Sequence, residues 1–143
     1  LKGTLHEKMF PYMFSFKANL YKIIGQEMTE FLETNGMIEI LPLAYIRGMN
    51  IDNSVVLIDE AQNISLGNMR TIMTRIGTNS KMIITGDSKQ IDLVKKSESS
   101  LEKIFEKFGA DPNFGTIRFE KDDQVRNPLI NIIEQGFDEL EVK

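Results

Sequence analysis

The chain has 143 residues, of which 41% are hydrophobic and 27% charged, and its formal net charge is −4. This length suits one ordinary domain with a real core, and the acidic balance excludes a generally basic nucleic-acid-coating protein while leaving room for a local basic patch. The sequence has no cysteine, which excludes disulfides and thiolate metal sites and favours a cytoplasmic setting, and it has no apolar run near the roughly 20 residues that cross a membrane.

The N-terminal part of the sequence predicts a helix and then a strand. Residues 17–33 repeat apolar side chains at helical spacing, and Asn35 with Gly36 is a typical end signal for such a helix. Residues 37–43 have the composition of a strand that ends near Pro42.

A polar loop is expected over residues 45–54. It places Tyr45 close to Arg47, a pair that suits single-stranded nucleic acid because the ring can stack on a base while the guanidinium binds a phosphate. A packed loop without a ligand explains the same two residues at least as well.

Two apolar strands each end in polar residues. Residues 55–59 run from four apolar side chains into the adjacent carboxylates Asp59 and Glu60. Residues 81–86 form the second apolar run, and a polar turn with the pattern G-D-x-x-Q follows it, from Gly86 to Gln90. These are the places where a buried strand delivers polar groups to a site.

Helices are expected to separate and follow these strands. Ser65, Ser97 and Asn127 are each placed to cap the start of a helix, and Pro128 suits a first helical position. The apolar patterns predict helices over 65–76, 97–108 and 127–140, with a short strand over 116–119.

This alternation of strand and helix predicts an α/β fold with a mainly parallel sheet flanked by helices. In such sheets the functional site lies at the carboxyl ends of the strands. Asp59, Glu60, Asp87 and Gln90 all fall at those ends in this reading.

These residues fit a phosphoryl-transfer site that uses ATP and Mg²⁺. Asp59 is placed to hold Mg²⁺ directly or through water, and Glu60 to polarise the attacking water. Gln62 and Gln90 carry amides that can donate and accept, which suits groups that sense the γ-phosphate. The alternative is a strand that simply ends in two solvated acids.

Arg126 precedes the last expected helix and could act as an arginine finger on the transferred phosphoryl group. Spacing alone favours an ordinary exposed arginine paired with Asp122 or Asp123.

The motifs together closely resemble the PhoH-like family, a branch of the P-loop ATPases related to superfamily 1 helicases. The resemblance covers nearly the whole chain in order and rests on residues 5–12, 38–48, 57–63, 73–77, 80–87, 90–93 and 125–129. It implies a RecA-like domain that hydrolyses ATP, coupled to RNA or single-stranded nucleic acid and often assembled as a homo-oligomeric ring.

The resemblance also implies roles for individual residues. It places Asp59, Gln62, Gly86 and Asp87 in the nucleotide-binding set, and it gives Arg126 a contact with the γ-phosphate, in its own subunit or in a neighbour.

One element of the family pattern is absent from these residues. No phosphate loop of the form G-x-x-x-x-G-K-S/T occurs, and in the family it would lie before Leu1. We therefore expect a partial RecA-like P-loop fold without the phosphate-loop strand, which comes from a longer parent and has little ATPase activity alone. Direct pairing of residues 81–86 with 115–120 would count against this expectation.

Two other functions stay open at this point. The first is a non-catalytic nucleic-acid-binding or assembly module that keeps the fold. The second is a nuclease in which Asp59, Glu60 and Asp87 hold metal, although such a site usually gathers more carboxylates.

Overall fold

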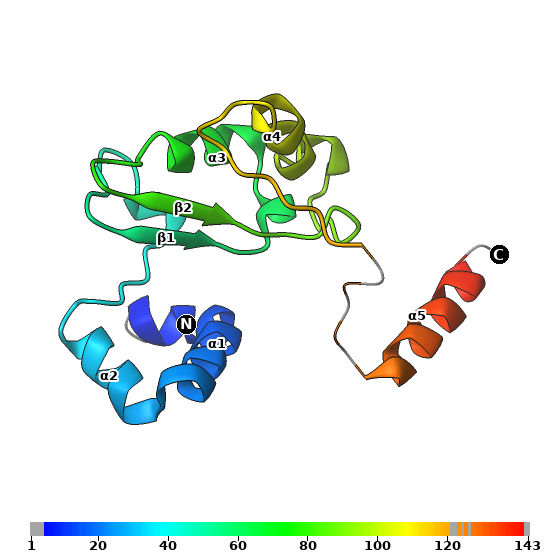
Figure 1. The fold of residues 1–143 in the computed structure, drawn as a ribbon, viewed down its shortest axis with the longest axis horizontal. Coiled ribbons are helices and arrows are strands. Elements are labelled where there is room, and N and C mark those ends of the chain that lie inside the picture. The colour runs from blue at the N-terminus through cyan, green and yellow to red at the C-terminus, as the bar shows by residue number, and fades with distance from the viewer. Residues whose placement is uncertain (1–4, 121–122, 124, 126, 142–143) are drawn as a thin grey trace. The chain divides into compact units, whose positions relative to one another are not determined.

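The computed structural model describes residues 5–120, 123, 125 and 127–141. Figure 1 shows α1 (Leu5–Ile24), α2 (Gln26–Thr34), β1 (Val55–Ile58), α3 (Leu66–Met73), β2 (Lys81–Ile84), α4 (Leu101–Phe108) and α5 (Pro128–Glu141). Short 3-10 helices lie at Leu43–Tyr45, Ala61–Asn63 and Lys96–Glu98. The chain divides into two compact units, Leu1–Val56 with Arg70–Met82 and Leu57–Met69 with Ile83–Lys143. Within the described ranges, no helix combines the length and apolar content that a membrane span requires.

The first unit begins with two helices where the sequence pattern predicts one helix over 17–33. Gly25 separates α1 from α2 with a φ of 82°, a left-handed conformation that glycine adopts without a steric penalty. The two helices are joined by an ion pair of 2.9 Å between Lys17 Nζ and Glu33 Oε2. The predicted helix end is confirmed, because α2 stops at Thr34, directly before Asn35 and Gly36.

The predicted strand over residues 37–43 is wrong. The N–H groups of Met37 and Ile38 instead donate to the carbonyl oxygen of Leu32, at 2.8 and 3.3 Å, and so close the end of α2. Pro42 has no N–H to give to a sheet, and a 3-10 helix follows it at once. The segment therefore continues as irregular chain into the loop that was expected.

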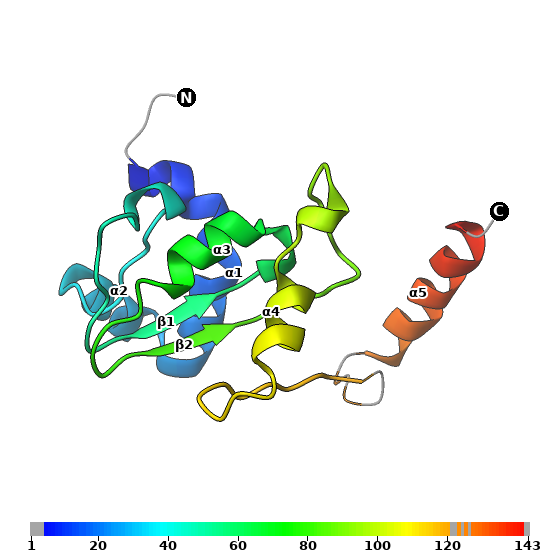
Figure 2. The same ribbon diagram turned by 90° about the horizontal axis from the view of Figure 1, so that it is seen from above.

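The predicted strands at 55–59 and 81–86 are confirmed as β1 and β2, which form a two-stranded sheet. Both views of the ribbon show the two strands side by side (Figures 1 and 2). Lys81 N–H donates to the carbonyl oxygen of Ser54, and Thr85 N–H to that of Ile58. The sheet is parallel, because the donor and the acceptor both advance by four residues. This confirms the α/β class, with α3 between the two strands in sequence.

The predicted strand over 116–119 is also wrong. Among the residues that the structure describes, β2 pairs with β1 alone, and residues 114–120 are irregular. Arg118 instead places its guanidinium 4.7 Å from the ring centre of Phe105 on α4, and Phe114 stacks on Phe108 at 4.8 Å. Side-chain contacts with a helix hold this segment, rather than a strand ladder.

The helices agree with the expected caps in two of three cases. Ser65 Oγ accepts from Asn68 N–H at 3.4 Å before α3, and Asn127 Oδ1 accepts from Leu129 N–H at 3.0 Å at the start of α5. The helix that was expected to start at Ser97 begins later, with Ser100 as the residue before α4. The helix expected over 65–76 ends earlier than predicted, because α3 stops at Met73.

The early end of α3 is explained by hydrogen bonds to Ile51. Ile51 N–H donates to the carbonyl oxygen of Arg75, and Gly77 N–H donates to that of Ile51, each at 2.9 Å. The chain after α3 therefore pairs with Ile51 in a parallel bridge instead of continuing the helix.

The core of the described residues is small, and many apolar side chains are exposed. Met69 and Ile72 of α3 are buried, together with Ile46, Ile58 and Ala61, whereas Ile76 is 45% exposed. The apolar face of α5 is exposed; it comprises Leu129, Ile132, Ile133, Phe137 and Leu140. Exposed apolar residues on the two strands are Val55, Leu57 and Ile83.

Candidate active site

Asp59 and Thr85 follow the carboxyl ends of the two parallel strands. Thr85 N–H donates to the carbonyl oxygen of Ile58 at 2.8 Å, which aligns the two strand ends. The Thr85 hydroxyl then donates to Asp59 Oδ1, also at 2.8 Å. Asp59 Oδ1 accepts a further bond of 2.9 Å from the N–H of Glu60. One carboxylate oxygen of Asp59 is thereby held by two donors.

Glu60 has an unusual backbone conformation. Its φ of 54° and ψ of 36° lie in the left-handed region, which is unfavourable for a residue with a long side chain. The turn directs the chain from β1 into the 3-10 helix Ala61–Asn63. Strain of this kind is concentrated at functional sites, where the surrounding structure holds it in place.

Gln62 is the centre of the hydrogen-bond network. Its side-chain nitrogen Nε2 donates to Glu60 Oε2 at 2.6 Å and to the carbonyl oxygen of Gln90 at 3.1 Å. Its oxygen Oε1 accepts from Asp87 N–H at 3.0 Å. Only 1% of Gln62 is exposed, whereas its partners Glu60, Asp87 and Gln90 are exposed residues.

The turn after β2 is closed by Asp87. Its Oδ1 accepts from Lys89 N–H and its Oδ2 from Gln90 Nε2, each at 2.9 Å. Gly86 precedes this turn and packs closely on Gln62. A Cβ atom at Gly86 would lie 2.5 Å from Gln62 Oε1, so this approach requires glycine.

The 3-10 helix Ala61–Asn63 is also tied to the chain that follows the turn. Asn63 Oδ1 accepts from Asp92 N–H at 2.7 Å. Ser100 N–H donates to the carbonyl oxygen of Ile64 at 3.0 Å, just before α4. These bonds hold residues 59–64 against both the 86–92 segment and the start of α4.

Glu102 of α4 connects the turn of residues 86–90 to the 114–118 segment. Arg118 donates to its two carboxylate oxygens at 3.2 and 2.8 Å. The hydrogen bond from Arg118, and then one from Ser88, lowers the pKa of Glu102 below its ordinary value, while partial burial opposes the shift. The same bond raises the pKa of Arg118. Ser88 belongs to the turn that carries Gln90, so α4 contacts both sides of this arrangement.

The structure brings together six of the predicted site residues. Asp59, Glu60, Gln62, Gly86, Asp87 and Gln90 are joined by contacts and hydrogen bonds within the second unit. Tyr45 and Arg47 belong to the first unit, where both are exposed, Tyr45 at 59%. Arg126 lies outside the described residues.

Sequence reasoning missed Thr85, Asn63 and the pair of Ser88 with Glu102. Thr85 could have been found, because it is the one hydroxyl residue at the end of β2 and the parallel register places it beside Asp59. Asn63 and Glu102 gave no comparable signal, since their partners lie 29 and 16 residues away in the chain.

The donor set fits a hard divalent cation at Asp59. Within the part of the chain that the structure describes, Asp59 Oδ2 accepts no hydrogen bond and can therefore bind a ligand. The same residues contain no group of three or more His, Cys, Asp or Glu that could enclose a metal. Mg²⁺ commonly binds through one or two carboxylates and completes its shell with water and phosphate oxygens.

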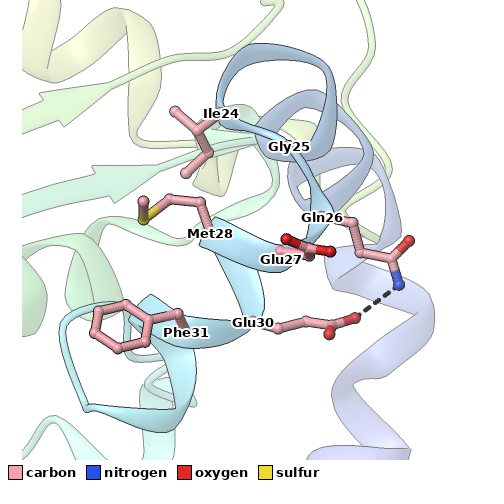
Figure 3. A pocket seen from close by; sticks show the side chains of 7 residues that line it. All are labelled: Ile24, Gly25, Gln26, Glu27, Met28, Glu30 and Phe31. Carbon is pink, nitrogen blue, oxygen red and sulfur yellow. Dashed lines mark hydrogen bonds between the residues drawn. The ribbon is translucent and has the colours of Figure 1, made fainter.

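A hollow in the first unit lies at the corner between α1 and α2 (Figure 3). Residues 24–28, 30 and 31 line it, and Gln26 Nε2 donates to Glu30 Oε1 at 2.8 Å on its exposed rim. It contains none of the predicted site residues.

Comparison with known proteins identifies relatives over nearly the whole chain. The family described as PhoH-like protein matches residues 1–138. A PhoH-like protein of Bacillus subtilis (strain 168) is 41% identical over 138 residues, which cover 96% of this chain and 43% of that protein. Protein PhoH of Escherichia coli (strain K12) is 37% identical over 131 residues, covering 90% and 37%. A PhoH-like protein of Synechocystis sp. is 34% identical over 141 residues, covering 99% and 43%. The chain spans about two fifths of the length of these relatives.

Proposed function

The chain belongs to the PhoH-like protein family, and on that basis we propose that residues 57–92 supply the acid and sensor part of an ATP-hydrolysing site in the complete protein. The observation that carries this proposal is the network in which buried Gln62 joins the Glu60 carboxylate to the turn of Asp87 and Gln90. A strand end with two independently solvated acids would not need such a network. The fold proposed for the complete protein is a RecA-like P-loop domain.

Each residue of the cluster has a distinct role in this proposal. Asp59 binds Mg²⁺ through its free oxygen, and Glu60 orients and polarises the attacking water. Gly86, Asp87 and Gln90 form the turn that faces the γ-phosphate. Bound Mg²⁺ would neutralise charge on the phosphate oxygens. Direct contact of Gln62 with nucleotide stays a prediction, and it would compete with the hydrogen bonds that its amide already makes.

The proposal is tested on the product of the complete reading frame that includes residues 1–143. Asp59→Asn and Glu60→Gln each keep the shape of the side chain, so we expect intact folding and a fall in ATP turnover of about 100-fold or more. Glu134→Gln on α5 is the matched control, because Glu134 is exposed and lies outside the cluster. Wild-type turnover in Glu60→Gln would contradict the proposal and would favour a non-catalytic binding or assembly module.

Arg126 is proposed as the arginine that contacts the γ-phosphate in a homo-oligomeric ring. Arg126→Ala should abolish turnover while Arg126→Lys restores little of it, because a lysine cannot make the planar bidentate contact. Mixing Glu60→Gln subunits with Arg126→Ala subunits distinguishes the two arrangements. Recovered activity in the mixture indicates an arginine supplied to the neighbouring subunit, and no recovery indicates one that serves its own site.

We also propose that the exposed pair of Tyr45 and Arg47 binds RNA or single-stranded DNA and so couples it to the ATPase. Base stacking and phosphate binding need an exposed ring near a cation, and both side chains are exposed. Tyr45→Ala and Arg47→Ala should weaken binding of a fluorescent oligonucleotide, whereas Tyr45→Phe and Arg47→Lys should retain most of it. Binding that is unchanged in both alanine variants would exclude this surface.

A further inference from the structure

We infer that Gln62 is a positioning residue, which holds the Glu60 carboxylate and the turn of residues 86–90 in one rigid unit, rather than a ligand of the nucleotide. The inference rests on the proposed function, since it assigns Gln62 a task in the same site. It concerns a residue that touches neither substrate nor metal and acts through its two neighbours.

The first argument is that the amide of Gln62 is nearly saturated. A glutamine amide offers two N–H donors and one carbonyl oxygen. Both donors are used, on Glu60 Oε2 and on the carbonyl oxygen of Gln90, and the oxygen accepts from Asp87 N–H. The amide orientation is set by chemistry, because the reverse orientation would face two acceptors with an oxygen.

The second argument is burial. At 1% exposure Gln62 has almost no surface on which a ligand could bind. A buried polar side chain that loses a partner bears the full cost of desolvation, so the network is stable only while all its members stay in place. Gln26 is a contrasting case in the same chain: it is exposed and makes one bond to Glu30 (Figure 3).

The third argument is the close approach of Gly86. A Cβ atom there would lie 2.5 Å from Gln62 Oε1 and 3.1 Å from the backbone nitrogen of Ala61. The start of the turn of residues 86–90 is therefore packed directly on the amide that holds Glu60. A shift of the turn moves Gln62, and a shift of Gln62 moves the carboxylate of Glu60.

Gln62 therefore connects the Glu60 carboxylate to the turn of residues 86–90. The turn proposed to face the γ-phosphate and the carboxylate proposed to orient water share one buried side chain. Gln62 consequently sets where the Glu60 carboxylate lies when the turn is in its ordered position.

The main test uses Gln62→Leu in the complete protein, with Gln26→Leu as the matched control. Amide hydrogen exchange at Asp87 is measured without nucleotide, because Asp87 N–H donates to Gln62 Oε1. Loss of that bond should accelerate its exchange about three- to tenfold. Turnover number should fall at least about tenfold while the dissociation constant for Mg-ATP changes less than about twofold. Gln26→Leu should change none of these quantities.

A second variant separates the acceptor of the Gln62 amide from its donors. Gln62→Glu keeps the acceptor for Asp87 N–H but replaces both donors and faces Glu60 with a like charge. We expect Asp87 to stay protected from exchange in this variant while turnover falls as in Gln62→Leu.

The outcomes separate this inference from the proposed function. Nucleotide binding that weakens about tenfold in a folded Gln62→Leu protein with an unchanged turnover number would make Gln62 a ligand and overturn the inference. Unchanged exchange at Asp87 and unchanged turnover in a folded Gln62→Leu protein would overturn it as well, with the ATPase proposal intact. If the wild-type protein has no ATP turnover, the ATPase proposal fails, and with it the expected effect of Gln62 on turnover. The exchange measurement still decides whether Gln62 holds the turn.

Discussion

The hydroxyl of Thr85 and the carboxylate of Asp59 are joined by a hydrogen bond of 2.8 Å between residues 26 positions apart in the chain. The bond forms because parallel pairing of β1 with β2 brings the two strand ends to the same edge of the sheet. It occupies Oδ1 of Asp59, whereas Oδ2 accepts no hydrogen bond from the residues that the structure describes. Thr85 thus orients the carboxylate that we propose as the Mg²⁺ ligand.

Replacing Thr85 by valine should therefore weaken the response to Mg²⁺. Valine keeps the shape of the side chain and its preference for strands, but it has no hydroxyl to hold Asp59. We expect the Mg²⁺ concentration for half-maximal ATP turnover to rise about three- to tenfold. Thr85→Ser restores the hydroxyl and should restore the wild-type value. An identical Mg²⁺ titration for Thr85→Val and wild type would show that Asp59 needs no such support.

Gly86→Ala and Gly67→Ala should change stability in opposite directions. At Gly86 the added Cβ meets Gln62 Oε1 at 2.5 Å and Leu101 Cδ2 at 3.0 Å, so we expect a loss of about 1–3 kcal/mol in the free energy of unfolding. At Gly67, in the first turn of α3, nothing lies within 4 Å of the new atom. Alanine there should stabilise by about 0.4–1 kcal/mol. Urea unfolding of both variants measures the difference, and a stabilised Gly86→Ala would refute the close packing.

The elements that the sequence predicts well are those that depend on local signals. β1 and β2 are apolar runs with polar ends, and α5 begins at Asn127 and Pro128 as capping rules require. The positions of Asp59 and Gln90 at one edge followed from these elements together with the rule for parallel sheets. Local pattern and topology were enough to predict that these residues lie together.

The errors concern features that depend on distant partners. Residues 116–119 alternate as a strand does, but among the described residues they gain an ion pair and ring contacts with α4 in place of a ladder. The sequence also gives no sign of the hydrogen-bond partners of Gln62, because Asp87 and Gln90 come from the next strand end. Periodicity cannot reveal which side chains a residue will meet across the fold.

The ion pair of Glu102 with Arg118 predicts a change at acidic pH. Hydrogen bonds from Arg118 and then Ser88 lower the pKa of Glu102 from its ordinary value of 4.5. Because the pKa is lower in the folded state, the stabilisation is complete above 4.5 and is lost as the pH falls through the lowered pKa. The side-chain N–H signals of Arg118 in NMR should therefore stay constant from pH 7 down to about 5 and change below that range.

The control for this titration is Glu102→Gln, which should remove the acid transition of the Arg118 signals because no carboxylate is left to protonate. Glu106→Gln, on the same helix, should leave the transition in place. If wild type and Glu102→Gln give the same profile, the transition belongs to another group and the proposed link between α4 and the 114–118 segment is wrong.

The left-handed backbone of Glu60 predicts an inverted order of stability for two substitutions. Glu60→Ala and Glu60→Gly both remove the carboxylate and its bond to Gln62, so they differ in how well each residue tolerates a φ of 54° and in chain entropy. A residue with a Cβ is strained there by about 1–2 kcal/mol, whereas glycine is not. Glu60→Gly should therefore unfold at a higher urea concentration than Glu60→Ala. Its free energy of unfolding should be about 1 kcal/mol higher after the greater chain entropy of glycine is counted. At Glu106, inside α4, the usual order should hold, with the alanine variant more stable by about 1 kcal/mol. The same order at both positions would mean that Glu60 carries no backbone strain, and the site would then lose its clearest sign that structure is held in place for function.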